Sequence, residues 1–279
     1  MEWWAWPIVL FAITFAMGIV AVLAGVGGGV LFVPIMAAFF PFHLDFVRAG
    51  GLLLALTTAL SAAPSLLRSG LASVRLAMPL ALVSSVTSIA GATLGLALPT
   101  GALQAALGVA ILAIVVLMWR SRGSEQPSLP RADPLGHALG MHGVYHDPAL
   151  GRDIAWQVQR TPAGLAVFAV IGVVAGMFGL GAGWANVPAL NLLMGVPLKL
   201  AVGTSGFLLI AGASTASWVY LQRGAVLPML IVPSIIGAIL GAKVGVRVLR
   251  AAKPALIRRV VLVLLFLAGG RALLRGFGV

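Results

Sequence analysis

Long apolar runs separated by short polar turns dominate the chain. Several of them reach the roughly 20 residues that a helix needs to cross the ~30 Å hydrocarbon core of a bilayer. The pattern predicts an all-α polytopic membrane protein with about eight transmembrane helices. The predicted segments are 8–24 continuing as a broken segment to about 41, 48–67, 76–98, 101–119, 163–179 continuing as a broken segment to about 195, 199–221, 226–249 and 254–274.

Two of these segments, 8–41 and 163–195, are too long for one ordinary crossing. A straight helix over the first of them would be about 50 Å long. Each contains a Gly-rich stretch that ends in Val-Pro, GVGGGVLFVP at 25–34 and GLGAGWANVP at 179–188. Irregular backbone at membrane depth is tolerated only where protein or a water-filled cavity satisfies its polar groups. The sequence therefore predicts helices that cross, break toward the interior and continue as re-entrant or tilted half-helices.

The two Gly-rich stretches belong to an internal repeat with an offset of 154 residues (25 to 179). The repeat predicts a first transmembrane half at 1–119, a polar linker at 120–161 and a second transmembrane half at 162–279. Four spans per half are expected, and the loop charges leave open whether the halves are parallel or inverted. Further ungapped matches pair Gly18 with Gly172, Ala21 with Ala175, Gly70 with Gly224, Pro79 with Pro233, and Gly91 with Gly245.

The composition agrees with a membrane protein, because 61% of the residues are hydrophobic, 9% are charged and the mean hydropathy is +1.11. No Lys or Arg precedes the first apolar run, so the N-terminus lacks the charged region of a signal peptide, and the first helix is expected to be retained. Trp3, Trp4 and Trp6 are typical of an interfacial aromatic belt. The absence of cysteine excludes disulfides and thiolate metal sites.

The linker at 120–161 carries five arginines, which favours the cytoplasmic side. The loop at 250–259 is also basic, and with four spans per half the two loops would lie on opposite faces. His137, His142 and His146 suggest a metal site, but their glycine-containing stretch has no strong helical pattern, and neither a metal nor a cofactor is predicted. The net charge of +12 is assigned to topology and to anionic lipid rather than to nucleic acid.

Acidic residues are confined to termini and loops. This distribution argues against an intramembrane proton relay, a carboxylate ring for cations or an aspartyl protease. Asp45, at the end of a segment, remains a candidate for a coupling role. The acidic residues are Glu2, Asp45, Glu125, Asp133, Asp147 and Asp153.

A small anion is the ligand that the breaks favour. A Gly-rich turn leading into a half-helix leaves backbone N–H groups unpaired, and the helix dipole adds partial positive charge there. The alternative is that glycines permit close helix packing, which is preferred for Gly91, Gly95, Gly237, Gly241 and Gly245. The residues predicted to bind the anion through the two breaks are Gly25, Gly27, Gly28, Gly29, Pro34, Gly179, Gly181, Gly183 and Pro188.

The repeated Gly-rich motif with its Val-Pro ending, the two four-span halves and the Gly-Thr-Ser at 203–205 resemble the TauE/SafE family of membrane anion permeases. Outside the linker, the resemblance covers nearly the whole chain. Members are associated with export of sulfite and small organosulfonates, and some relatives with uptake of sulfur oxyanions. The resemblance implies a sulfur-containing anion, whose tetrahedral headgroup suits convergent N–H donors.

The two halves differ at the predicted site. Gly50 and Gly51 occupy the positions that match Thr204 and Ser205, and Phe32 matches Asn186. We therefore expect backbone donors from both halves but side-chain donors mainly from Asn186, Thr204 and Ser205. Asn191, which matches Ala37, is a weaker candidate. Three hydroxyls in the segment 48–67 are also weaker candidates, because hydroxyls in a helix often bond the backbone of that helix. They are those of Thr57, Thr58 and Ser61.

These observations predict a carrier that is not an enzyme, moves a small anion by alternating access and exports it from a bacterial cell across the cytoplasmic (inner) membrane. Its expected partners are the anion and the bilayer, with a homo-oligomer left open. Uptake is the alternative within the same class. An anion channel, an anion-sensing membrane scaffold and an intramembrane enzyme are alternatives from other classes, and the enzyme lacks a nucleophile with acid or base neighbours.

Overall fold

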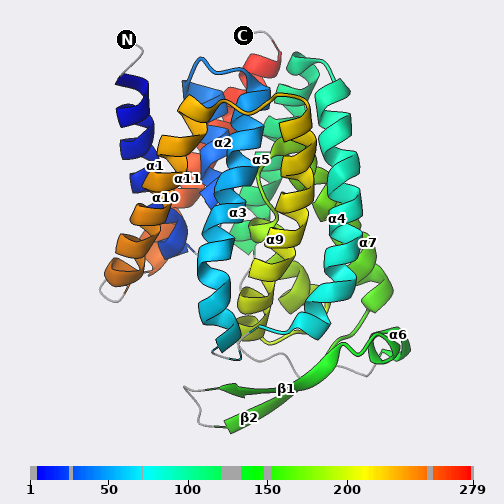
Figure 1. The fold of residues 1–279 in the computed structure, drawn as a ribbon. Coiled ribbons are helices and arrows are strands. Elements are labelled where there is room, and N and C mark those ends of the chain that lie inside the picture. Colours follow the sequence, from blue (N-terminus) through cyan, green and yellow to red (C-terminus); the bar gives the residue numbers. More distant parts are fainter. Residues whose placement is uncertain are drawn as a thin grey trace.

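The computed structural model describes residues 5–24, 28–68, 70, 72–120, 133–147, 152–249 and 254–277, which are mostly helical (Figure 1). Prolines begin three of the helices, where their missing N–H has no intrahelical partner to lose. The elements are α1 (Ala5–Ala24), α2 (Gly28–Phe39), α3 (Leu44–Arg68), α4 (Val74–Ala97), α5 (Thr100–Arg120), α6 (Pro134–Ala138), β1 (His142–Asp147), β2 (Arg152–Gln157), α7 (Thr161–Phe178), α8 (Gly183–Pro188), the π-helical turn η1 (Ala189–Leu193), α9 (Leu198–Gln222), α10 (Pro228–Leu249) and α11 (Pro254–Gly276).

The helices are those of an integral membrane protein. Within the described ranges, four are long and apolar enough to cross a bilayer: Leu44–Ser61 of α3, α4, α7 and α9. Large apolar side chains such as Leu82, Val86 and Val170 are more than 60% exposed on the outside of the bundle, as expected of a surface that meets lipid. Shorter apolar helical stretches are Trp6–Ala21, Gly28–Phe39, Thr100–Val116, Pro228–Val244 and Leu265–Leu274.

Both broken segments turn back instead of adding a net crossing. In the first, the ring of Trp6 at the start of α1 lies 5.2 Å from that of Phe42, just beyond α2, so α2 returns to the end where α1 begins. In the second, the Gln159 N–H donates to the Met194 carbonyl at 3.0 Å, which brings the end of η1 back beside the start of α7. Each break is therefore re-entrant, and α3 and α9 each begin at the end where the broken segment before them began.

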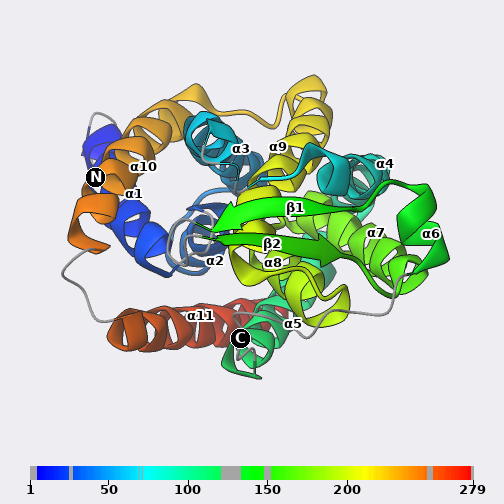
Figure 2. The same ribbon diagram turned by 90° about the horizontal axis from the view of Figure 1, so that it is seen from below.

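The bundle pairs helices across the two halves of the chain. α1 packs chiefly on α10, α4 on α7, α5 on α11 and α3 on α9 (Figures 1 and 2). α3 and α9 run antiparallel, because Arg48 near the start of α3 stacks over Tyr220 near the end of α9 at 5.4 Å. The starts of α3, α4 and α5 are followed at an offset of 154 residues by those of α9, α10 and α11 (44 to 198, 74 to 228, 100 to 254).

Four glycines allow these pairs to approach closely, as the sequence predicts. A Cβ at any of them would lie less than 3.0 Å from a backbone carbonyl oxygen of the facing helix. Small residues at membrane helix interfaces permit such contact. They are Gly91 and Gly95 in α4, facing α7, and Gly237 and Gly241 in α10, facing α1; the surroundings of Gly245 lie outside the described side chains.

The linker contains structure that the sequence analysis misses. β1 and β2 form an antiparallel hairpin in which His142 pairs with Gln157, so the prediction of an all-α protein is wrong for this segment. His142 and His146 lie on a strand rather than on one helical face, and the described residues contain no cluster of three or more metal-ligating side chains. Tyr145 and Trp156 of the hairpin pack with Phe168 of α7 and Leu200 of α9 in one hydrophobic cluster.

Asp133 fastens the described part of the linker to the second half. Its carboxylate accepts hydrogen bonds from the Thr161 N–H at the start of α7 and from the Leu135 N–H of α6, which it caps. The hydrogen bond from the Thr161 N–H lowers the pKa of Asp133 below its usual value of 3.8. The described part of the linker is thus attached to the start of α7 by a charge-assisted hydrogen bond.

The described helix ends that border the two basic loops lie at one end of the bundle, not on opposite faces. α10 ends and α11 begins at the end that carries the hairpin, where α5 also ends and α7 begins, while both chain termini lie at the other end (Figure 1). Four full spans per half would place these loops on opposite faces, whereas here each broken segment turns back to the end where it began. Residues 121–132 and 250–253 lie outside the described residues, but the helix ends that flank them are at this same end.

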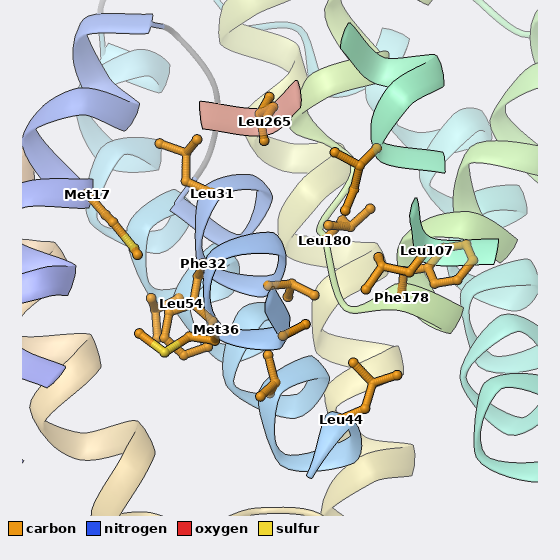
Figure 3. Close-up of a cluster of buried hydrophobic side chains, with 14 of the residues drawn as sticks. Met17, Leu31, Phe32, Met36, Leu44, Leu54, Leu107, Phe178, Leu180 and Leu265 are labelled. Atoms are coloured by element: carbon orange, nitrogen blue, oxygen red, sulfur yellow. The ribbon is translucent and has the colours of Figure 1, made fainter. Parts of the chain in front are cut away.

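The centre of the bundle is built around α2. Ten of its twelve residues are buried. Phe32 and Met36 of α2 belong to a hydrophobic cluster that also contains Met17 of α1, Leu54 of α3 and Leu180 after α7 (Figure 3). A helix that is buried almost all round is enclosed by its neighbours, and α2 therefore lies at the middle of the protein.

Candidate functional site

The two Gly-rich breaks meet in the interior of the bundle. A Cβ on Gly29, at the start of α2, would lie 3.0 Å from the Leu180 carbonyl oxygen and 2.6 Å from that of Gly51 in α3. Gly51 in turn lies against the carbonyl of Gly179. α3 is thus the element on which the start of α2 and the end of α7 come together. Gly25 and Gly27 lie outside the described residues.

The second break has a defined backbone path. Gly179 ends α7 with φ 71° while its N–H bonds the Ala175 carbonyl, and Gly181 has φ 69°. Both values are in the left-handed region, where a side chain adds strain. Ala182 then accepts hydrogen bonds from the N–H groups of Ala185 and Asn186, which starts the segment 183–193. Gly183 is the first residue of α8.

The predicted glycines differ in how closely their neighbours pack on them. Gly29 and Gly179 are against backbone atoms, and a Cβ on Gly179 would collide with the main chain of Arg48. At Gly28, by contrast, the nearest atom to an added Cβ is Thr58 Cγ2 at 3.6 Å, an ordinary van der Waals distance. Close packing therefore explains Gly29 and Gly179, while it does not explain Gly28.

The two prolines interrupt the helices that leave the breaks. Pro34 lies inside α2 and Pro188 at the end of α8, and neither has an N–H to donate to the carbonyl four residues earlier. After Pro188 the helix widens into η1, where the Met194 N–H bonds the Ala189 carbonyl. π-helical turns of this kind are frequent at functional sites.

Asn186 and Ser205 come together, whereas Thr204 turns elsewhere. Asn186 is fully buried, its Nδ2 lies 3.5 Å from the Ser205 carbonyl, and its Oδ1 has no hydrogen-bond partner among the described residues. Thr204 Oγ1 instead accepts the Ser73 N–H at 3.2 Å. Asn191 donates to the Val196 carbonyl at 2.9 Å.

The hydroxyls on α3 bond within their helix. Thr57 and Thr58 donate to the Leu53 and Leu54 carbonyls at 2.8 Å, and Ser61 donates to that of Thr58 at 2.7 Å. This is the local arrangement that the sequence analysis expects for them.

Sequence reasoning misses Trp184 and Arg48. Trp184 follows the break, is partly buried between two hydrophobic clusters, and its indole N–H has no partner among the described residues. Arg48 is 1% exposed and is the one charged residue that the described part of the chain buries fully. An aspartate three residues before an arginine, at the start of an apolar segment, is the signal that could have found it, because Asp45 and Arg48 would share a helix face.

These features define a class of integral membrane protein in which two discontinuous helices meet at the centre of a helical bundle. The chain belongs to the TauE/SafE family, since the profile described as sulfite exporter TauE/SafE matches residues 10–272. That family consists of membrane transporters and not of enzymes, so the family resemblance seen in the sequence is confirmed.

A curated relative agrees with this assignment. The chain is 30% identical over 147 residues to a protein of Bacillus subtilis (strain 168) described as "Probable membrane transporter protein YunE". The alignment covers 52% of this chain and 53% of the relative, so the chain spans about half the length of that protein. No solved structure matches the chain.

Proposed function

We propose that the protein is a permease for a small anion, and that the anion binds between the start of α2 and the start of the helical segment 183–193. The observation that carries the proposal is the meeting of the two breaks beside Gly51. Both segments run away from that point, α2 toward one end of the bundle and 183–193 toward the other. Two helix starts, each with unpaired N–H groups and a partial positive charge, then face one position.

The polar groups near this position suit an anion. The indole N–H of Trp184 has no partner among the described residues, and Gly28 has no side chain that would keep a ligand away from its backbone. Among the described residues, the acidic residue that lies in a membrane-length apolar helix is Asp45, in the first turn of α3. A sulfonate or sulfite group has three oxygens that N–H donors can share, which supports a sulfur oxyanion or organosulfonate such as sulfite or sulfoacetate.

Alternating access is supported by the layout of the two halves. Helices that correspond at the offset of 154 residues, such as α3 and α9, run antiparallel, which is the arrangement of an inverted repeat (44 to 198). Carriers built from inverted repeats expose a central site to each side in turn by rocking one repeat against the other. The domain limits 1–119, 120–161 and 162–279 follow from the same repeat.

The end with the hairpin is proposed to face the cytoplasm of a bacterial cell, across the inner membrane. The described helix ends there carry Arg120, Arg160, Lys199 and Lys243. Positive loops remain on the cytoplasmic side. Export is favoured because the family's description is that of a sulfite exporter, and uptake is the second candidate.

Thermal stabilisation of the purified protein by sulfite, sulfoacetate, thiosulfate, sulfate, acetate and chloride tests the proposal. A ligand that binds only the folded state raises the Tm with its affinity. We expect selective stabilisation by a sulfur oxyanion in the wild type, and weaker stabilisation in Gly28→Ala and Asn186→Ala. Ser217→Ala is the matched control, because Ser217 Oγ is also buried and without a partner among the described residues. Failure of every anion to stabilise a well-folded wild type would reject the proposal.

Flux measurements separate a carrier from the other classes. In proteoliposomes loaded with the stabilising anion, a carrier gives saturable flux that is stimulated by the same anion on the opposite side. A channel gives conductance without this counterflow, and a sensing scaffold gives neither. The expected result is counterflow without measurable conductance.

A further inference from the structure

Arg48 lies at the edge of the proposed site, on the side that faces away from the hairpin. Its main chain contacts Gly179 at the break, and its Nη1 donates to the Met177 carbonyl at 2.9 Å, two residues before the break. The guanidinium also stacks over the ring of Tyr220 and lies next to Gly95 of α4. A cation held at this place is within the bundle, and its burial is costly unless it is paired.

Asp45, the carboxylate partner of Arg48, uses only some of the N–H donors of the guanidinium. Asp45 Oδ1 accepts from Nη2, while Nε is buried and has no partner among the described residues. Nε–H and Nη2–H of an arginine point in the same direction and form one bidentate edge for two oxygens. Asp45 therefore fills one donor of this edge and leaves the other unused.

Asp45 is also able to leave. Its side chain is 30% exposed, in contrast to 1% for Arg48, and its Oδ2 lies 3.4 Å from Nδ1 of His43, whose side chain is 57% exposed. A carboxylate at the mouth of the bundle can exchange Arg48 for water and His43 without entering the interior. The ion pair thus joins a fixed, buried cation to a replaceable, partly exposed anion.

We propose that Arg48 is a binding residue for the transported anion and that the Asp45 carboxylate takes its place when no anion is bound. Two oxygens of a sulfonate or sulfite then occupy Nε–H and Nη2–H together, and Asp45 is displaced toward solvent. The second half has no counterpart, because the position that matches Arg48 is Val202. The pathway is therefore asymmetric, with a cationic ligand on the side away from the hairpin. This inference rests on the proposed anion permease function.

The alternative is a purely structural role at the end of α7. Arg48 and the Tyr220 hydroxyl both donate to the carbonyls at the C-terminus of α7, with Tyr220 Oη 3.1 Å from the Gly176 and 3.2 Å from the Met177 carbonyl oxygen. These carbonyls have no partner within the helix. Tyr220→Phe removes one such donor and keeps the ring beneath the guanidinium, so it is a matched control for the capping role.

The experiment measures the dissociation constants of sulfite and sulfoacetate by thermal stabilisation for the wild type, Arg48→Gln, Asp45→Asn and Tyr220→Phe. We expect binding about tenfold weaker or more in Arg48→Gln, which loses a charge-assisted bidentate pair. Binding should become several-fold tighter in Asp45→Asn, which loses the competing carboxylate. Tyr220→Phe should lower the Tm but leave the dissociation constant unchanged.

Several outcomes overturn the inference. Unchanged affinity in a folded Arg48→Gln variant, unchanged or weaker binding in Asp45→Asn, or an equal loss of affinity in Tyr220→Phe and Arg48→Gln would each assign Arg48 to structure alone. If Arg48→Gln does not fold, the direction of the change in Asp45→Asn decides. Lack of any anion response in the wild type would instead reject the permease proposal, so the two failures are distinct.

Discussion

Gly51 of α3 lies directly on the carbonyl of Gly179, so one helix of the first half supports the break of the second half. Gly29 of α2 also packs on Gly51, because a Cβ added to Gly29 would lie 2.6 Å from the Gly51 carbonyl oxygen. The three glycines allow three backbone segments to meet where side chains would keep them apart. The position of both half-helices depends on this contact.

Gly51→Ala is therefore expected to destabilise the protein. The added methyl would meet the Gly179 carbonyl and a Val33 methyl, and overpacking of this kind costs about 1–3 kcal/mol. Thermal unfolding in detergent measures the effect as a lower Tm.

Gly28→Ala is the matched control, because its nearest neighbour would be 3.6 Å away. It should change the free energy of unfolding by no more than about 0.5 kcal/mol. Equal losses in the two variants would show that steric contact at Gly51 does not hold the breaks together.

A second pair of glycines tests the helix interfaces. Gly91→Ala should lower the Tm, because its Cβ would collide with the Val173 carbonyl where α4 packs on α7. Gly212→Ala, in α9, would meet no atom within 4 Å and should be neutral or stabilising by up to about 1 kcal/mol, since Ala favours the helix. A neutral Gly91→Ala would contradict the close α4–α7 contact.

Much of the fold follows from the sequence because apolar runs and glycine spacing report directly on burial in a membrane. The predicted run 199–221 falls on α9 and 76–98 on α4, and the break after Phe178 begins at the glycine where it is expected. The repeat offset also places the helix starts of the second half. These features depend on local composition, which can be taken directly from the sequence.

Other features depend on contacts between distant segments, which no local pattern reports. β1 and β2 are short, an isolated two-stranded hairpin is only marginally stable, and their packing on α7 and α9 joins segments that are distant in the sequence. Thr204 looks equivalent to Ser205 in the sequence, but it bonds Ser73 from another helix end. Arg48 reads as a charge at the end of a segment until the end of α7 and Tyr220 are placed around it.

Asp133 should make the attachment of the linker sensitive to acid. Its pKa is lowered in the folded protein, so its contribution to stability is fully present above the unfolded value near 3.8 and is lost as the pH falls through the lower folded value. Asp133→Asn removes this dependence. Hydrogen exchange of a peptide covering β2 and the start of α7, compared between the two proteins at pH 7 and near pH 3, measures it.

At pH 7 we expect faster exchange in Asp133→Asn than in the wild type, and near pH 3 the difference should shrink. Comparison at the same pH cancels the intrinsic exchange rate. A difference that stays constant between the two pH values would show that the charge of Asp133 does not hold the linker.

The orientation can be tested with single cysteines because the chain contains none. Val144 of the hairpin is 65% exposed, and Arg223, after α9, is exposed at the opposite end of the bundle. If each half crosses the membrane an odd number of times, these two positions lie on different sides, whereas an even number of crossings in each half would place them on the same side. With the basic end in the cytoplasm, a membrane-impermeant maleimide added to intact cells should label Arg223→Cys and not Val144→Cys. In lysed cells both variants should be labelled, which shows that each thiol is accessible.

Labelling of Val144→Cys alone in intact cells would reverse the orientation while preserving the fold. Labelling of both variants or of neither would reject the inverted arrangement of the halves.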